Sequence, residues 1–379
     1  MKILEVATFK LGACGPTEVL IPIIKNINQK NEHSVDVFST LTFDEEKEKK
    51  LTELNAKYFY KKKSKVLSKK EILSVIPDFA TYDLIHIHGV YNIDNIMIAK
   101  LAYKMGIPYV ITTHGNLMEH SLQHSKIKKK LALFLFIKRF LRNAESIHAL
   151  SNQEEKDIKK IFKHKNISII PNGIELLKEK DQLKNTIKND KVSLLFIGRI
   201  DVHHKGIDIL IDSLLSLTEK GRGKYELYLV GPYDGNFDEE YIKNKIKENS
   251  ILKNIIKIEG PKYGDDKEKY YEKCDLFVHT SRYEGMPIAV LEAIAHGLPI
   301  LITPETNLAD IVNQSENGFI TSTEINTVTN SLTEISELTK ADLKGLGLNG
   351  KRWATSNLSW EKISKEYLVM YTRSMEKQD

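Results

Sequence analysis

Cysteine is scarce in this chain and long hydrophobic runs are missing. The 379 residues include only Cys14 and Cys274, so a framework of several disulfides is excluded. Such a low count is typical of proteins from a reducing compartment. No window reaches about 18 uncharged apolar residues, which excludes a transmembrane helix. The first fifteen residues lack the features of a signal peptide. We therefore expect a cytoplasmic protein.

A strong charge of one sign and the usual metal-binding patterns are also missing. The 56 Lys and Arg residues exceed the 51 Asp and Glu residues by only five, so nucleic acid is not expected as a partner. The sequence contains no Asp-x-Asp motif, and its Cys and His residues do not occur at zinc spacing. We therefore expect no metal and no other cofactor. Any diphosphate would have to be bound by protein cations and a helix end.

Short β-branched runs alternate with longer helical patterns along the chain. The first half contains predicted strands in ILEVATF, SVDVFST, DLIHIHG, YVITTHG, SIHALS and ISIIPNG. After a polar stretch at residues 175–191 the alternation resumes with VSLLFIG, YELYLVG, IIKIEG, LFVHTS and PILIT. Strands alternating with helices indicate right-handed βαβ units and parallel sheets. The sequence thus predicts two doubly wound α/β domains facing each other across a cleft.

The predicted boundaries follow from the polar stretch. We expect an N-terminal domain at residues 1–180 and a C-terminal domain at residues 190–358. The pattern WEKISKEYLVMYTRSM predicts an amphipathic helix at about residues 360–376. Loops with glycine or histidine follow strands in both halves, and ligands of such sheets bind beside the carboxyl ends of strands. The cleft is therefore the expected site.

One loop and the helix after it combine two acids with glycine and proline. In SRYEGMPIAVLEAIAHG, Pro287 suits the first turn of a helix that Gly297 would end. The N–H groups at such a helix start attract anions, and Gly285 permits close approach of a ligand. Glu284 would then hydrogen-bond hydroxyls, and Glu292 would need a partner on an apolar helix. The alternative is that both acids are solvated.

Two cations follow the first strand of the second half. Arg199 lies directly after VSLLFIG, and Lys205 lies six residues later, before a predicted helix. Cations on one strand-end loop can neutralise a diphosphate. A solvated basic loop is the alternative.

Two further candidates belong to the first half. The sequence GACGPTE places Gly15 in a loop before a helix, which is either a tight turn or a ligand-binding loop. His114 ends the strand YVITTHG, where it could contact a reacting sugar or act as a base. A structural histidine bonded to a nearby carbonyl is the other possibility.

A basic segment with interleaved apolar residues follows His114. Residues 126–142 contain seven Lys and Arg residues and no acid. A basic amphipathic helix of this kind is typical of contact with an anionic membrane surface. A helix that packs its apolar face on the domain core would show the same pattern.

Several of these motifs together resemble a known family. SRYEGMPIAVLEAIAHGLPILIT, FIGRIDVHHKGIDILIDSL, IIPNGI and the His-Gly after VITT are similar to the signatures of family 4 (group 1) retaining glycosyltransferases, which have the GT-B fold. The resemblance covers nearly the whole chain. Segments such as HGNLMEHSLQHSK and TPETNL resemble bacterial enzymes that build capsular, exopolysaccharide or O-antigen repeat units on a lipid carrier.

The resemblance implies a role for each candidate residue. The residues that would bind the nucleotide-sugar donor are Gly15, Arg199, Lys205, Glu284, Gly285, Met286, Pro287 and Glu292. Those that would act in catalysis are His114, Arg199, Lys205 and Glu284. In this picture Arg199 and Lys205 hold the diphosphate, Glu284 the sugar and Glu292 the ribose. The family often has Gly-Gly where this chain has Cys14-Gly15, and its last helix crosses back onto the first domain.

The sequence thus predicts a retaining transferase that moves a hexose or N-acetylhexosamine from a nucleotide-diphosphate sugar to a sugar hydroxyl. The expected acceptor is a lipid-linked glycan of surface polysaccharide synthesis, and the expected place is the cytoplasm, at the inner face of the cell membrane. A sugar-nucleotide epimerase of the same fold is one alternative. A non-catalytic partner subunit is the other.

Overall fold

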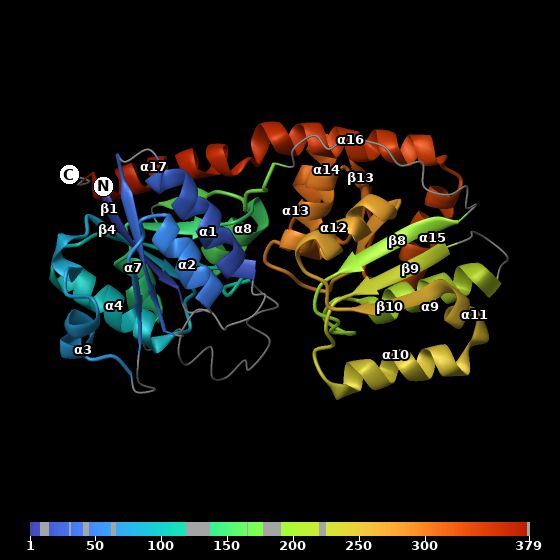
Figure 1. Cartoon of the computed structure of the whole chain (residues 1–379), viewed down its shortest axis with the longest axis horizontal. Helices are drawn as coiled ribbons and strands as arrows, with labels where there is room; N and C mark the ends of the chain where they lie inside the picture. The colour runs from blue at the N-terminus through green and yellow to red at the C-terminus, as the bar shows by residue number, and fades with distance from the viewer. Residues whose placement is uncertain are drawn as a thin grey trace. The chain divides into compact units, whose positions relative to one another are not determined.

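A computed structural model of the chain describes residues 1–7, 15–29, 32–40, 45–61, 66–118, 137–164, 166–176, 191–219 and 225–376. The chain divides into two compact units (Figure 1). The first unit comprises Met1–Gly173 and Trp360–Asp379, and the second comprises Ile174–Ser359. The chain therefore passes from one unit to the other twice.

A parallel seven-stranded sheet forms the centre of the first unit. The order of strands is β3-β2-β1-β4-β5-β6-β7, and every pair is parallel. The strands are β1 (Lys2–Ala7), β2 (Ser34–Ser39), β3 (Tyr58–Tyr60), β4 (Leu84–His88), β5 (Tyr109–Thr112), β6 (Ser146–Ala149) and β7 (Ile167–Ile169). The helices are α1 (Gly15–Asn28), α2 (Glu45–Glu53), α3 (Lys69–Val75), η1 (Phe79–Thr81), α4 (Ile93–Lys104), α7 (Lys138–Arg142), α8 (Asn152–Ile161) and α17 (Trp360–Met375).

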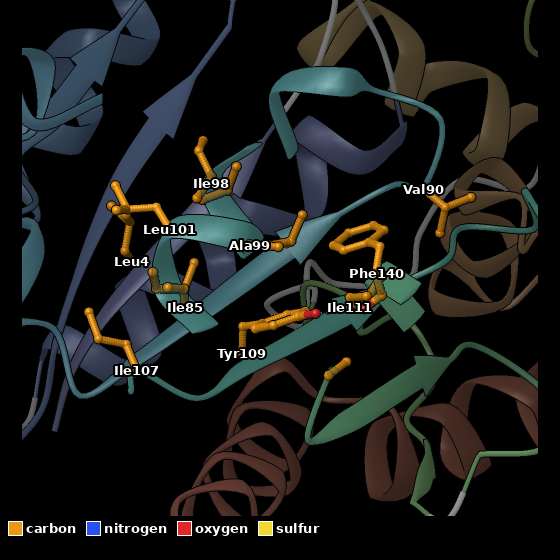
Figure 2. Close-up of a cluster of buried hydrophobic side chains, with 14 of the residues drawn as sticks. Leu4, Ile85, Val90, Ile98, Ala99, Leu101, Ile107, Tyr109, Ile111 and Phe140 are labelled. Carbon is orange, nitrogen blue, oxygen red and sulfur yellow. Dashed lines mark hydrogen bonds between the residues drawn. The ribbon is translucent and has the colours of Figure 1, made fainter. Parts of the chain in front are cut away.

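Hydrophobic side chains join one face of this sheet to α4. Leu4 on β1 and Ile85 on β4 lie near Leu101 and Ile98 of the helix, and Ile111 on β5 lies near Phe140 of α7 (Figure 2). Alternate residues of a strand point to opposite faces, so the residues between them lie on the other face of the sheet. That second face is not wholly apolar, and it carries part of the candidate site.

The second unit repeats the arrangement with six parallel strands. Their order is β10-β9-β8-β11-β12-β13. The strands are β8 (Val192–Ile197), β9 (Tyr225–Val230), β10 (Ile256–Gly260), β11 (Leu276–His279), β12 (Ile300–Ile302) and β13 (Gly318–Ile320). The helices are α9 (Ile207–Glu219), α10 (Asn236–Glu248), α11 (Ser250–Ile255), α12 (Gly264–Lys273), α13 (Ile288–His296), η3 (Pro304–Thr306), α14 (Ala309–Ser315), α15 (Ile325–Ser336) and α16 (Lys340–Asn357). The predicted α/β class with two doubly wound sheets is confirmed.

Glycines on α16 let this helix lie close to the end of α13. A side chain on Gly347 would place its Cβ 1.8 Å from the carbonyl oxygen of Gly297, which is the C-cap of α13 with φ 78°. Gly345 lies on the same helix and is exposed, and a Cβ added to it would meet nothing within 4 Å. The close packing of α16 on α13 therefore requires a glycine at position 347 but not at position 345.

The same substitution at these two positions should change the free energy of unfolding in opposite directions. Gly345→Ala should stabilise the protein by about 0.5–1 kcal/mol, because alanine loses less backbone entropy in a helix than glycine. Gly347→Ala should destabilise it by about 1–3 kcal/mol, because the methyl group forces α16 and α13 apart. Urea unfolding of the full chain measures both, and equal shifts of the same sign would contradict the packing described.

Candidate functional site

The candidate residues of the second unit follow the two strands at which the strand order of its sheet reverses. Arg199 and Lys205 follow β8, and Glu284 follows the neighbouring β11. Ligands of open parallel sheets bind beside the carboxyl ends of strands at such a switch point. The structure brings Lys205 and Glu284 into direct contact: the Lys205 Nζ donates to Glu284 Oε1.

Glu284 is a part-buried acid with several donors around it. Its side chain is 11 % exposed, so the solvated alternative is wrong for this residue. Besides Lys205, the Ser281 hydroxyl donates to its Oε1 at 3.0 Å, and His279 Nε2 lies 3.1 Å from the same atom. Burial alone would raise the pKa of Glu284, but the Lys205 charge and the His279 hydrogen bond hold that pKa well below its usual value. Glu284 is therefore a carboxylate.

Close backbone packing places the loop of Lys205 beside the end of β11. Gly206 has φ 64°, and a Cβ on it would lie 1.9 Å from the Thr280 carbonyl oxygen. The Thr280 hydroxyl donates to the Gly206 carbonyl at 2.9 Å. His204 stacks on Tyr283, with ring centroids 4.0 Å apart, and its Nε2 lies 2.8 Å from the Tyr283 carbonyl. His204 therefore joins the two loops.

Arg199 is held by other acids than Glu284. Its guanidinium donates to Asp234 and lies 3.7 Å from Asp201 Oδ2. The Arg199 side chain is 46 % exposed and Asp234 is 42 % exposed, so this ion pair stabilises the fold little and can be exchanged for another anion. Arg199 thus lies on the same loop as Lys205, with its charge accessible to solvent.

Asn307 orients the peptide groups between Glu284 and α13. Its Nδ2 donates to the carbonyl oxygens of Glu284 at 2.6 Å and Gly285 at 2.8 Å. In a trans peptide the N–H points opposite to the carbonyl, so the N–H groups of Gly285 and Met286 point away from the Asn307 amide. Pro287 is the N-cap of α13 rather than its first helical residue. Asn307 lies in the segment TPETNL, but no role for this residue followed from the sequence.

Glu292 lies on α13 and has protein partners of its own. The Lys267 Nζ donates to its Oε1 at 2.6 Å, and the Tyr271 hydroxyl donates to its Oε2 at 2.8 Å. These partners differ from those of Glu284. The partner that the sequence required for an acid on this helix is therefore supplied by α12, and the Glu292 side chain remains one-third exposed.

In the first unit, His114 begins a turn with unusual backbone angles. It has φ 47° and Gly115 has φ 73°, and left-handed non-glycine residues persist where surrounding structure enforces them, often at functional sites. The enforcing residue is Glu154 of α8, which is fully buried. Its carboxylate accepts hydrogen bonds from the Thr113 hydroxyl, the Gly115 N–H and the Leu150 N–H. Sequence reasoning missed Glu154, although its place three residues after Ser151 is a helix-start signal.

The ring of His114 contacts a group of buried polar side chains. Its Nε2 lies 2.8 Å from His88 Nδ1, and His88 Nε2 lies 2.7 Å from Glu5 Oε2. Within the described residues, Glu5, His86 and His88 are the one set of three whose ligand atoms are close enough to share a metal ion. All three are buried, and each histidine hydrogen-bonds Glu5, so the set is explained without an ion.

Some predicted features fall partly outside the described residues. Gly15 is the first residue of α1, but the loop before it is not among those residues. The same holds for residues 126–136 of the basic segment. In its described part, Phe140 and Leu141 of α7 are buried in the hydrophobic cluster of the first unit, while Lys138 is exposed. A search of the described helices found none with the length and apolar character needed to cross a membrane.

Comparison with known families and proteins agrees with this architecture. Residues 178–351 match the model for glycosyl transferases group 1, and residues 28–177 match the model for glycosyltransferase family 4. An uncharacterized glycosyltransferase of Methanocaldococcus jannaschii is 29 % identical over 282 residues, 74 % of this chain and 72 % of that protein. The O-antigen biosynthesis glycosyltransferase WclY of Escherichia coli is 23 % identical over 320 residues, 79 % of either chain.

The crystal structure of HepE of Anabaena in complex with UDP has a similar fold. It superposes with a TM-score of 0.75 at 20 % identity, covering 98 % of this chain and all of HepE. The two family models together span residues 28–351 of this chain. The chain belongs to the group 1, family 4 glycosyltransferases and has the GT-B fold. It is a glycosyltransferase, and its relatives include enzymes of polysaccharide biosynthesis.

Proposed function

We propose that the protein transfers a hexose or N-acetylhexosamine, with retention of configuration, from a nucleotide-diphosphate sugar to a sugar hydroxyl of a lipid-linked glycan. The observation that carries this proposal is the part-buried Lys205–Glu284 pair at the ends of β8 and β11. A cation and a carboxylate side by side can bind a phosphate and sugar hydroxyls of one ligand. HepE, which binds UDP and UDP-glucose in its crystal structures, makes UDP-sugars the first donors to test.

Each charged group has one task in this proposal. Lys205 and Arg199 stabilise the phosphate as it leaves, and the N–H groups of Gly285 and Met286 bind its oxygens. Glu284 accepts hydrogen bonds from the sugar, Glu292 from the ribose, and His114 contacts the transferred sugar. The leaving phosphate itself takes the proton of the attacking hydroxyl on the same face, so the configuration is retained without a glutamate nucleophile. Gly15 and Pro287 contribute backbone close to the donor.

Removing either member of the central pair should abolish transfer while the fold persists. We expect Lys205→Met and Glu284→Gln to lower kcat/KM by at least about 100-fold, because preorganised charge stabilises the transition state. Lys245→Met is the matched control, since Lys245 pairs with Asp212 at 2.8 Å on other elements of the second unit. Activity is measured with UDP-, GDP- and ADP-sugars, and folding by thermal unfolding. Full turnover in a pair variant would refute the assignment.

We further propose that transfer needs no metal ion. The support is the pair of cations on the loop after β8, which can neutralise a diphosphate as Mg²⁺ does in other transferases. Turnover should therefore be unchanged in excess EDTA, and added Mg²⁺ should not raise it. Activity that disappears in EDTA and returns with Mg²⁺ would contradict this proposal.

Contact with the membrane is a separate part of the proposal. Its support is the charge of residues 126–142, of which each cation near an anionic leaflet contributes about 1 kcal/mol. Phe140 and Leu141 are buried, so the contact would be electrostatic in the described part. Flotation with vesicles should show binding to vesicles containing phosphatidylglycerol, weakened by salt, and none to neutral ones. Absence of binding to both would remove the membrane role.

A further inference from the structure

Polar side chains form a row across the second face of the sheet in the first unit. Glu5 on β1 lies opposite His86 on β4, and Thr112 on β5 lies between His88 and His148 on its two neighbours. Because these residues alternate with those of the hydrophobic cluster, they all lie on the face away from it. All five are buried, with at most 1 % exposure.

The Glu5 carboxylate is the acceptor at one end of this row. The Tyr371 hydroxyl, from α17, donates to its Oε1 at 2.9 Å. His86 Nδ1 lies 3.2 Å from Oε1 and 2.8 Å from the Tyr371 oxygen. His88 Nε2 lies 2.7 Å from Oε2. The carboxylate therefore faces three groups that can each offer it a hydrogen.

A line of hydrogen-bond contacts runs from Glu5 to a backbone carbonyl. Four contacts connect Glu5, His86, Thr112, His148 and the carbonyl of Ile170, at distances of 2.6–3.2 Å. Both ends of the row are acceptors. The Tyr371 hydroxyl, 2.8 Å from His86 Nδ1, lies beside the first of these contacts.

The groups around Glu5 hold it as a carboxylate. Burial and the neighbouring His86 lower the pKa of His148 to about 3, so His148 keeps a single hydrogen, which it donates to the Ile170 carbonyl. Burial opposes the charge of Glu5, but His86 and His88 hold the pKa of Glu5 well below its usual value. Glu5 is then a carboxylate, and it can only accept from His88.

This state of Glu5 determines the tautomer of two more histidines. Since Glu5 accepts, His88 carries its hydrogen on Nε2, and its Nδ1 is an acceptor. His114 Nε2 lies 2.8 Å from that Nδ1, so His114 must carry its hydrogen on Nε2. The His114 Nδ1 then has a lone pair and no hydrogen. Burial lowers the pKa of both His88 and His114, in agreement with neutral rings.

We propose that Glu5 and His88 are positioning residues that hold His114 as the neutral tautomer with Nε2 protonated and Nδ1 as a hydrogen-bond acceptor. The consequence for the reaction rests on the proposed function, in which His114 contacts the transferred sugar. Under that function a sugar hydroxyl donates to His114 Nδ1, and His114 serves neither as a general acid nor as a cation. The proposed tautomer itself does not depend on the substrate.

Nitrogen NMR of the full chain with ¹⁵N-labelled histidine tests the tautomer without a substrate. His114 is assigned from the signal lost in His114→Gln. The unaltered protein should show His114 with a protonated Nε2 and an unprotonated Nδ1 at neutral pH. A protonated Nδ1, or a doubly protonated ring, would overturn the proposal, and this measurement requires no variant at Glu5.

A variant of Glu5 tests the cause. In Glu5→Gln the amide N–H can donate to His88 Nε2. His88 would then donate from Nδ1 to His114 Nε2, and the His114 hydrogen should move to Nδ1. Tyr371→Phe is the control, because it removes a hydrogen bond to Glu5 and leaves the carboxylate that faces His88. In this variant His114 should keep its hydrogen on Nε2 and show the same nitrogen signals as in the unaltered protein. An unchanged pattern in a folded Glu5→Gln variant would overturn the proposal.

Activity separates this inference from the proposed function. With the His114 hydrogen on Nδ1, the bond from the sugar hydroxyl is lost, and kcat/KM of Glu5→Gln should fall about tenfold. A reversed nitrogen pattern with unchanged kcat/KM would support the positioning by Glu5 and His88 while contradicting the role of His114 at the sugar.

Discussion

An ionised carboxylate inside a protein must be compensated by groups that stay with it. Glu5 is fully buried in the central strand β1, and it is the point on which the first unit depends. Desolvation of such a charge costs several kcal/mol, so the acid is tolerated only with donors and an opposite charge around it. His86 comes from the adjacent strand and Tyr371 from α17, at the other end of the chain. The Glu5 carboxylate thus connects the first strand to the last helix.

A similar constraint organises two other loops. Glu154, which is fully buried on α8, accepts three hydrogen bonds and thereby fixes the left-handed turn at His114. Glu284 is in hydrogen-bond contact with Lys205, Ser281 and His279 at the end of β11. In each place a buried or part-buried acid with several donors holds a strand-end loop in one geometry. Preorganisation of this kind is what a site for charged ligands requires.

Sequence patterns predicted the strands of the sheet centres because these are long, β-branched and bounded by glycine. They did not indicate β3 and β13, which are three-residue edge strands with mixed composition. The charged loops after β8 and β11 could also be predicted, because the residues of each loop are close together in the sequence. Which loop contacts which depends on strand order, and that information is not local.

The polar row could not be predicted for a related reason. Glu5 was visible as an acid in an apolar strand, and His86 and His88 as histidines at a strand end. Their contact with His148 depends on the register of four strands that are far apart in the sequence. Tyr371 fitted the apolar stripe of a helix, and nothing in that pattern indicated the partner of its hydroxyl. The sequence therefore indicated the polar residues within each segment, but it did not indicate which of them would contact one another.

Glu5 is buried and Glu284 is part-buried, and their partners differ in a way that bears on function. The partners of Glu5 are enclosed, and no ligand can replace them. Glu284 is paired with Lys205, whose side chain is 13 % exposed and belongs to a loop at the strand ends. Under the proposed function, a diphosphate that binds Lys205 weakens the ion pair between Lys205 and Glu284. The Glu284 carboxylate then needs other hydrogen-bond donors. The hydroxyls of an attached sugar can provide them, whereas a nucleotide without a sugar cannot. The ion pair would thus couple recognition of the phosphate to recognition of the sugar.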